Sequence, residues 1–332
     1  MELSQRIGVV VLQLGGPDSL AAVEPFLYNL FSDPDIIAIP FGTIFRRPHA
    51  RFIARKRAPI AAEHYRHIGG RSPINEITAR QSAALEQSLN RSVPARVFVA
   101  MRYWNPSTSE AVDALVKEHI GRVVLLPLYP HYSVTTTGSS LNEWNRVVTA
   151  SHARFETDTI QEYHLHPAYI KSIVERITEA LQRFPEQHRS SVHLLFSAHG
   201  TPESLVRKGD PYKKQIESTV DSVMKTGKFS QNHDLSFQSR VGPQKWISPF
   251  TTETVRRLAG GGVKNLIVIP IAFVSDHIET LYELNVEVRE LAMRNGIGQF
   301  EITEGLNTSA TFIEALTQLV LTSIRRPSGR SV

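Results

Sequence analysis

The chain contains three groups of side chains that can hold a metal ion or move a proton, each placed directly after an apolar run. The groups are His199; Ser275, Asp276, His277 and Glu279; and His131, Tyr132 and Ser133 with the hydroxyl-rich stretch that extends to Ser140. A neutral imidazole that faces carboxylates can ligate a divalent cation or remove a proton. These residue types predict a site for a divalent metal or for proton removal, provided that the fold brings His199 to the carboxylates.

Each group also fits an ordinary structural role. Asp276 and Glu279 have the spacing of a capping box at the start of a helix. His199 could be an ordinary loop histidine whose ring is hydrogen-bonded to the backbone. Ser139 or Ser140 could instead cap the start of a helix. The residues alone leave both interpretations open.

Composition and missing motifs exclude several classes of protein. The 332 residues include no Cys, which rules out disulfides, thiolate zinc sites, a cysteine nucleophile and a cysteine-ligated iron–sulfur cluster. A net charge of +5 is too small and too scattered to predict nucleic-acid binding. The sequence has no nucleotide-binding glycine motif, no HExxH and no GxSxG. The glycine run at 259–265 predicts a helix end rather than a phosphate-binding loop.

Short apolar runs, which suit strands buried on both faces of a parallel sheet, alternate with longer amphipathic segments. The runs are residues 7–14, 95–101, 122–128, 192–198, 236–241 and 265–271. Residues 109–121 and 168–184 space their apolar side chains at three and four, as helices do. This alternation predicts an α/β architecture with the three chemical groups at the carboxyl ends of strands, where open α/β sheets bind ligands.

Landmarks of the first half of the chain recur in the same order in the second half. The pairs are LGGPDSL (14–20) with HGTPESL (199–205), AMRYW (100–104) with QSRVGPQKW (238–246), and RVVLLPLYP (122–130) with NLIVIPIAF (265–273). We therefore predict two similar Rossmann-like halves, each a parallel sheet flanked by helices, with a cleft between them.

The front half carries an insertion at about residues 24–59. Its first part is rich in Phe, Leu and Ile, and its second part is rich in Arg and Lys, with no acidic residue from Arg46 until Glu63. An apolar segment beside a basic one is typical of an interfacial anchor for anionic lipid. A helix with a solvated basic face is the alternative.

Taken in order, segments along nearly the whole chain closely resemble the ferrochelatase family, whose members insert ferrous iron into a porphyrin to make haem. They are LQLGGPDSL, VEPFLYNLFSDPDII, HYRHIGGRSPINEIT, MRYWNPSTSEAV, LPLYPHYSVTTTGSSLNEW, LLFSAHGTPESLVRKGDPY, FQSRVGPQKWISPFT and VIPIAFVSDHIETLYEL, within residues 7–290. The resemblance implies a metal chelatase, a lyase, with Fe²⁺ as a substrate and no permanently bound cofactor. Its fold would be two Rossmann-like halves around a porphyrin cleft.

The resemblance also implies roles for individual residues. His199 and Glu279 match the family's active-site pair, as iron ligands or as the groups that handle the displaced pyrrole protons. His277 and Asp276 match supporting polar residues beside that pair. The substrate-binding positions it implies are Arg102 and Tyr103 near the metal approach, Tyr65 and Ser72 near the porphyrin propionates, and Leu14, Trp246 and Phe273 against the ring.

Departures from the family pattern bear on the substrate. The lack of Cys excludes the [2Fe–2S] cluster of some members. Arg71 stands where many relatives have a third Gly and adds a positive charge near the expected propionate edge. Leu14 occupies a position where the coproporphyrin-using branch tends to have Tyr. This favours protoporphyrin IX, with coproporphyrin III or another tetrapyrrole as the alternative substrate and a non-catalytic haem- or metal-binding protein as the alternative class.

The resemblance assigns the apolar part of the insertion (24–45) to the family's lips at the cleft mouth, which favours peripheral membrane contact. We expect Leu27, Leu30 and Phe31 to make that contact. No apolar run is long enough for a spanning helix and no signal segment precedes the first strand, so we expect a cytoplasmic protein, peripheral at the membrane surface. The expected boundaries are 1–160 joined by a helix at 308–325, 161–307, and a disordered basic tail at 326–332.

Overall fold

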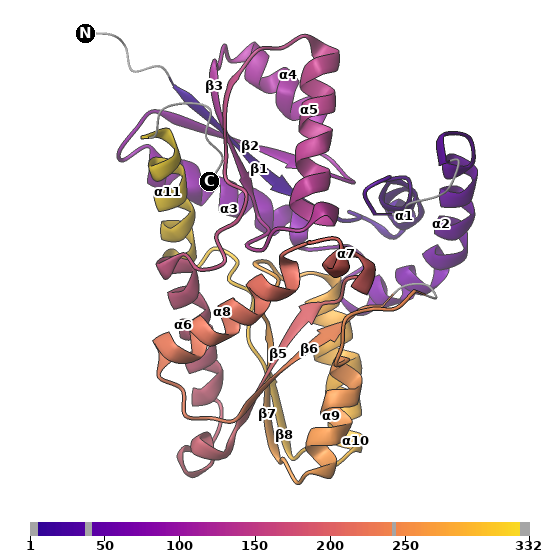
Figure 1. Ribbon diagram of the computed structural model, residues 1–332, viewed down its shortest axis with the longest axis vertical. Coiled ribbons are helices and arrows are strands. Elements are labelled where there is room, and N and C mark those ends of the chain that lie inside the picture. Colours follow the sequence, from indigo (N-terminus) through magenta and orange to yellow (C-terminus); the bar gives the residue numbers. More distant parts are fainter. Residues whose placement is uncertain (1–5, 37–41, 241–243, 326–332) are drawn as a thin grey trace. The chain divides into compact units, whose positions relative to one another are not determined.

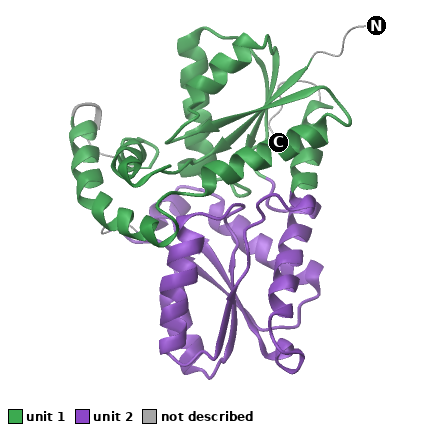
Figure 2. Ribbon diagram, turned by 180° about the vertical axis from the view of Figure 1, so that it is seen from behind, with its two compact units in different colours: residues 1–162, 313–332 green, residues 163–312 purple. Residues whose placement is uncertain are grey.

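Two four-stranded parallel sheets organise the part of the chain that the computed structural model describes, residues 6–36, 42–240 and 244–325 (Figure 1). Each sheet belongs to a separate compact unit. Unit 1 comprises residues 1–162 and 313–332, and unit 2 comprises residues 163–312 (Figure 2). The expected tail at 326–332 and part of the expected lip, 37–41, lie outside the described residues.

Unit 1 contains a sheet in the order β2-β1-β3-β4. Its strands are β1 Ile7–Gln13, β2 Ala95–Met101, β3 Arg122–Pro127 and β4 Glu156–Thr159. Its helical segments are Leu20–Ala22, α1 Val23–Phe31, α2 Gly42–His67, α3 Ile74–Leu89, α4 Thr108–Lys117, the π-helix Val134–Gly138 and α5 Ser139–Ser151, with most of α11 Ala310–Ile324.

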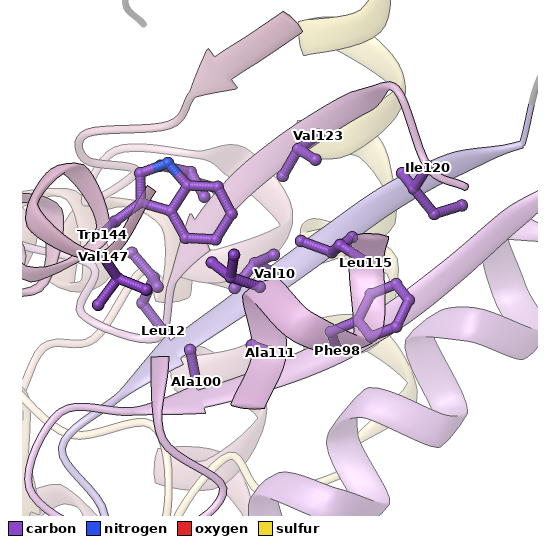
Figure 3. Close-up of a cluster of buried hydrophobic side chains, with 12 residues drawn as sticks. Val10, Leu12, Phe98, Ala100, Ala111, Leu115, Ile120, Val123, Trp144 and Val147 are labelled. Atoms are coloured by element: carbon purple, nitrogen blue, oxygen red, sulfur yellow. The ribbon is translucent and has the colours of Figure 1, made fainter. Parts of the chain in front are cut away.

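One face of this sheet carries a hydrophobic core beneath α4 and α5. Val10 and Leu12 of β1 lie in it with Leu115 of α4 and Trp144 of α5, all at most 2% exposed (Figure 3). Gly8 permits this packing, because a Cβ there would come within 2.6 Å of Leu115 Cδ2. Burial of the apolar side chains therefore fixes the face of β1 that α4 and α5 cover.

Unit 2 repeats the arrangement with the order β6-β5-β7-β8. Its strands are β5 His193–His199, β6 His233–Gln238, β7 Asn265–Pro270 and β8 Gln299–Ile302. Its helical segments are α6 Pro167–Gln182, Glu186–Ser191, α7 Glu203–Arg207, α8 Tyr212–Gly227, α9 Thr251–Gly260, the π-helix Glu279–Val288 and α10 Arg289–Arg294. Leu195, Val268 and Leu284, all fully buried, lie in the core between this sheet and its helices.

The predicted α/β fold with two similar halves is confirmed. Each of the six apolar runs contributes to a strand, although the run at 236–241 supplies only the last three residues of β6 and its residue 241 lies outside the described residues. Residues 109–121 and 168–184 contribute α4 and α6, and α9 ends within the glycine run. The equivalent strands pair at equivalent positions, since Leu12 lies opposite Pro127 and Ser197 lies opposite Pro270. Among the described residues, no helix is long and apolar enough to cross a membrane.

The structure differs from the sequence-based expectation for the lip segment (24–45) in the choice of residues that face outward. Phe31 is 6% exposed and lies in a cluster with Ala50 and Ala54 of α2, against which Leu27 and Leu30 also pack. The apolar side of α1 is thus covered by α2 within unit 1. Phe31 is therefore buried within unit 1, whereas Leu27 and Leu30 are half-buried, and membrane contact through this segment stays a prediction.

Candidate active site

Unit 2 brings His199 and Glu279 together at the carboxyl end of its sheet. His199 is the last residue of β5, and Glu279 follows the loop that leaves β7. Because β5 and β7 are parallel neighbours, both segments leave the sheet at the same edge. His199 Nε2 lies 3.7 Å from Glu279 Oε1, and His277 Nε2 lies 3.5 Å from Glu279 Oε2. A carboxylate between two imidazoles is the centre of this candidate site.

Backbone carbonyls determine which ring nitrogen of each histidine faces Glu279. His199 Nδ1 lies 2.6 Å from the carbonyl oxygen of Gly200, and His277 Nδ1 lies 3.0 Å from that of Ser275. A carbonyl oxygen only accepts, so each Nδ1 carries the hydrogen and each Nε2 is left to bind a proton or a metal ion. The loop-histidine interpretation of His199 is therefore correct for Nδ1 and does not use Nε2.

The backbone around His199 is held from two sides. The hydroxyl of Tyr212 donates to the His199 carbonyl oxygen at 3.0 Å. A Cβ on Gly200 would come within 2.9 Å of the Gln238 carbonyl oxygen, so the chain needs glycine to lie this close to β6. These contacts fix the direction in which the imidazole leaves β5.

The surroundings of His277 and Glu279 shift the pKa of both groups. Burial alone lowers the pKa of His277, but its contact with Glu279, the Ser275 carbonyl and the charge of Asp276 outweigh burial, so the pKa is raised. Burial alone raises the pKa of Glu279, but the charges of His199 and His277 outweigh it, so the pKa is lowered. The site therefore favours an ionised Glu279 beside a protonated His277.

A second carboxyl group, Glu283, was not predicted from the sequence. It follows Glu279 by one turn on the π-helix and accepts a hydrogen bond from the Ser239 hydroxyl. Burial and the nearby charge of Glu279 raise the pKa of Glu283 to about 7. The spacing in ETLYE was the available signal, because residues four apart share a helix face. π-Helices are themselves frequent at functional sites.

The capping-box interpretation of Asp276 and Glu279 is wrong. The π-helix has no side-chain cap, and the Asp276 carboxylate instead accepts from Gly305 N at 3.2 Å and from Asn307 Nδ2 at 2.7 Å. Asn307 Oδ1 accepts in turn from Asp276 N at 3.0 Å. Asp276 thus ties the loop before the π-helix to the loop after β8, and the Glu279 carboxylate remains available to the histidines.

Two aromatic rings adjoin the histidines. Phe273 lies 4.4 Å from the His277 ring and 6.5 Å from the His199 ring, measured between centroids. Trp246 lies 6.3 Å from the His199 ring at an interplanar angle of 63°. Unit 2 therefore brings together all six predicted site residues that it contains.

Unit 1 carries a different polar cluster at the carboxyl end of its own sheet. Arg102 and Tyr103 follow β2, and both contact Asp33 and Ser139. Ser139 accepts from Arg102 Nε at 2.7 Å and donates to Asp33 Oδ2 at 2.5 Å. The prediction that Ser139 or Ser140 caps a helix is wrong, since Ser133 makes the capping bond there, to Thr135 N.

The other predicted residues of unit 1 are largely buried. Leu14 follows β1, and its carbonyl oxygen accepts from Tyr103 N at 3.1 Å, which places it beside the Arg102 cluster. Tyr65 lies near the end of α2 and is 6% exposed. Ser72 is 5% exposed and lies so close to Gly16 that a Cβ on the glycine would come within 2.6 Å of the Ser72 hydroxyl oxygen.

The described residues include no cluster of three or more His, Cys, Asp or Glu that could hold a metal ion. The pair that the sequence predicts as metal ligands, His199 and Glu279, presents a nitrogen and a carboxylate to the same place. Nitrogen and oxygen donors of this kind suit ferrous iron.

Two solved structures have a similar fold over nearly the whole of this chain. SirB from Bacillus subtilis with Fe³⁺ matches with a TM-score of 0.57 at 11% identity and covers 96% of both chains. The multi-domain protein DR2241 from Deinococcus radiodurans, described as structurally similar to chelatases, matches with a TM-score of 0.52 at 12% identity, over 98% of this chain and 57% of that one. The fold is that of the two-lobed chelatases.

Sequence comparison gives the family. The ferrochelatase family profile matches residues 6–324. The chain is 49% identical to the ferrochelatase of Geotalea uraniireducens (strain Rf4) over 96% of this chain and 98% of that protein. It is 43% identical to the ferrochelatase of Trichodesmium erythraeum (strain IMS101) over 97% of this chain and 84% of that protein. The chain belongs to the ferrochelatase family and is a metal chelatase, a lyase of haem biosynthesis.

Proposed function

We propose that this chain inserts Fe²⁺ into protoporphyrin IX and releases two protons. The observation that carries the proposal is the Glu279 carboxylate between the Nε2 atoms of His199 and His277. Metal insertion needs a base, because both pyrrole N–H protons must leave the ring. This cluster offers the Nε2 atom of His199 and the Glu279 carboxylate for that purpose.

The proposed roles follow from the contacts of each residue. His199 Nε2, which carries no hydrogen in the neutral ring, takes a pyrrole proton or donates to iron, and Glu279 acts with it as the second base or ligand. His277 holds a proton next to Glu279 and keeps that carboxylate ionised. Asp276 acts as a positioning residue through Asn307 and Gly305.

The proposed porphyrin contacts combine apolar surfaces with a few polar groups, as a flat apolar ring with anionic propionates requires. Phe273 and Trp246 adjoin His199, and Leu14 supplies an aliphatic surface in unit 1. Arg102, Tyr103, Tyr65 and Ser72 are the proposed polar contacts. Arg71 is exposed and lies 3.6 Å from Glu76, so its charge is partly compensated. Leu14 is the residue that favours protoporphyrin IX over coproporphyrin III.

Anaerobic turnover of the purified protein with Fe²⁺ tests this proposal, with protoporphyrin IX and coproporphyrin III compared side by side. We expect a preference for protoporphyrin IX and loss of insertion in Glu279→Ala. Glu287→Gln changes an exposed carboxyl of the same helix and is the matched control. A preference for coproporphyrin III would refute the substrate assignment. Unchanged turnover in Glu279→Ala would refute the assigned base.

We also propose that α2 contacts an anionic membrane surface from outside. Phe45, Phe52 and Ile60 are 60%, 57% and 64% exposed, and their spacing of seven and eight residues brings them to one side of a helix. Lys56 Nζ lies 4.7 Å from the Phe52 ring centroid, and several Arg residues of α2 are close in sequence to these three apolar residues. Exposed apolar side chains next to basic ones suit the interface of an anionic bilayer.

Sedimentation with vesicles tests the membrane contact. Serine at Phe45, Phe52 and Ile60 should greatly reduce binding to phosphatidylglycerol vesicles. The matched control has serine at three exposed apolar residues elsewhere, Val116, Leu165 and Met293. Equal binding by the two triple variants would contradict the proposal, as would equal binding of the unaltered protein to phosphatidylcholine and phosphatidylglycerol.

A further inference from the structure

Asp33 is a fully buried carboxylate on which the polar cluster of unit 1 converges. Its side chain has 0% exposure. Its Oδ2 accepts from the hydroxyls of Tyr103 and Ser139, each at 2.5 Å, and lies 3.0 Å from Arg102 Nη2. A buried charge is stable only when it is paired and hydrogen-bonded, so these three partners and Asp33 hold one another in place.

Because of its position in the chain, Asp33 connects this cluster to α1. Asp33 lies just beyond the end of α1, and its backbone nitrogen donates to the Leu30 carbonyl oxygen at 3.3 Å. Its other carboxylate oxygen accepts from Asp35 N at 2.9 Å. From within α1, Asn29 Nδ2 donates to the Tyr103 carbonyl oxygen at 3.0 Å. The end of α1 is therefore bonded to the Arg102–Tyr103 segment through both side chain and backbone.

We propose that Asp33 is a positioning residue that orients Arg102 and Tyr103 for the porphyrin and links their orientation to α1. The inference rests on the proposed function, in which Arg102 and Tyr103 contact substrate. Ser139 reinforces the link, because it accepts from Arg102 Nε and donates to Asp33. The Arg102 guanidinium also lies 4.9 Å from the Tyr103 ring centroid, so a change at Asp33 alters both side chains together.

Asp33→Asn tests this role, because it removes the charge and leaves the size nearly unchanged. We expect the KM for porphyrin to rise about tenfold while kcat changes little, the pattern of lost binding rather than lost chemistry. Asp158→Asn is the matched control, since Asp158 is buried in the same unit and pairs with Arg122 at 2.9 Å, away from this cluster. It should lower stability without raising the KM. Equal KM values in the two variants would overturn the proposal.

A double-mutant cycle with Arg102→Met asks whether Asp33 acts through Arg102. We expect Asp33→Asn to add little to the KM of Arg102→Met, whereas multiplied effects would contradict the link. If Asp33→Asn does not fold, Ser139→Ala breaks three hydrogen bonds of the cluster without removing a charge and should raise the KM in the same direction. An unchanged KM in that variant would overturn the proposal. Porphyrin Kd values from fluorescence quenching separate this test from the test of the proposed function, because they report the effect of Asp33→Asn on binding even if the protein inserts no iron.

Discussion

The half-buried carboxyl group of Glu283 should make unit 2 less stable as the pH rises. Its pKa is raised from an ordinary value of 4.5 to about 7 by burial and by the charge of Glu279. Between these two values the folded state holds a proton that the unfolded state has released. The free energy of unfolding must then fall with increasing pH in this window. At about 1.4 kcal/mol for each unit of pKa, the total is about 3 kcal/mol.

Glu283→Gln should remove this contribution, because the amide cannot ionise and its oxygen still accepts from Ser239. The free energy of unfolding of the unaltered protein relative to Glu283→Gln should therefore fall by about 3 kcal/mol between pH 4.5 and pH 8. Denaturant-dependent hydrogen exchange of β5 and β7 peptides measures unit 2 separately from unit 1. Glu287→Gln controls for the loss of a carboxylate from this helix, because the Glu287 charge is the smallest of the effects that raise the Glu283 pKa and most of the pH dependence should remain. A difference that stays constant within about 0.5 kcal/mol across the range would show that Glu283 is ionised throughout and would refute the reasoning.

Three further substitutions test other contacts. His199→Ala should abolish iron insertion but change porphyrin binding by only about 1–2 kcal/mol, since the ring contacts remain, and substantial turnover would remove His199 from the mechanism. Ser107→Ala removes the capping box of α4, in which Ser107 accepts from Glu110 N, and should lower the free energy of unfolding of unit 1 by about 1 kcal/mol in denaturant titrations. Gly8→Ala should cost about 1–3 kcal/mol in the same titrations, because the new methyl group meets Leu115, and an unchanged midpoint would contradict the packing.

The fold was predictable where strands are long and buried. The six apolar runs became the central strands and one edge strand of each sheet, because a strand buried on both faces needs continuous apolar residues. The two missed strands are the opposite edges, β4 and β8, with only four residues each. The β4 sequence ETDT has no apolar side chain, so no hydrophobic pattern indicates a strand there.

The candidate site was predictable where a residue lies at the carboxyl end of a strand or in the loop that leaves it. His199 and Glu279 meet because the carboxyl ends of β5 and β7 are neighbours, which the alternation of strands and helices already implies. Asp33 follows a helix, and its partners Tyr103 and Ser139 are 70 and 106 residues further along the chain. Local spacing contains no information about such contacts. For the same reason the covering of α1 by α2 could not be read from the apolar sequence of α1.

The two units have the same strand order and pairing but carry different polar clusters at the carboxyl ends of their strands. Leu12 opposite Pro127 and Ser197 opposite Pro270 are equivalent pairs, so Leu14 in unit 1 occupies the place that His199 occupies in unit 2. Unit 2 surrounds this place with groups whose pKa is raised by their surroundings, His277 and Glu283, the latter to about 7. Unit 1 instead pairs the Arg102 guanidinium, which carries a charge at all ordinary pH values, with the buried carboxylate of Asp33. Since the scaffold is the same, the residues at the strand ends decide the chemistry, and proton removal is expected of unit 2 and fixed-charge recognition of unit 1.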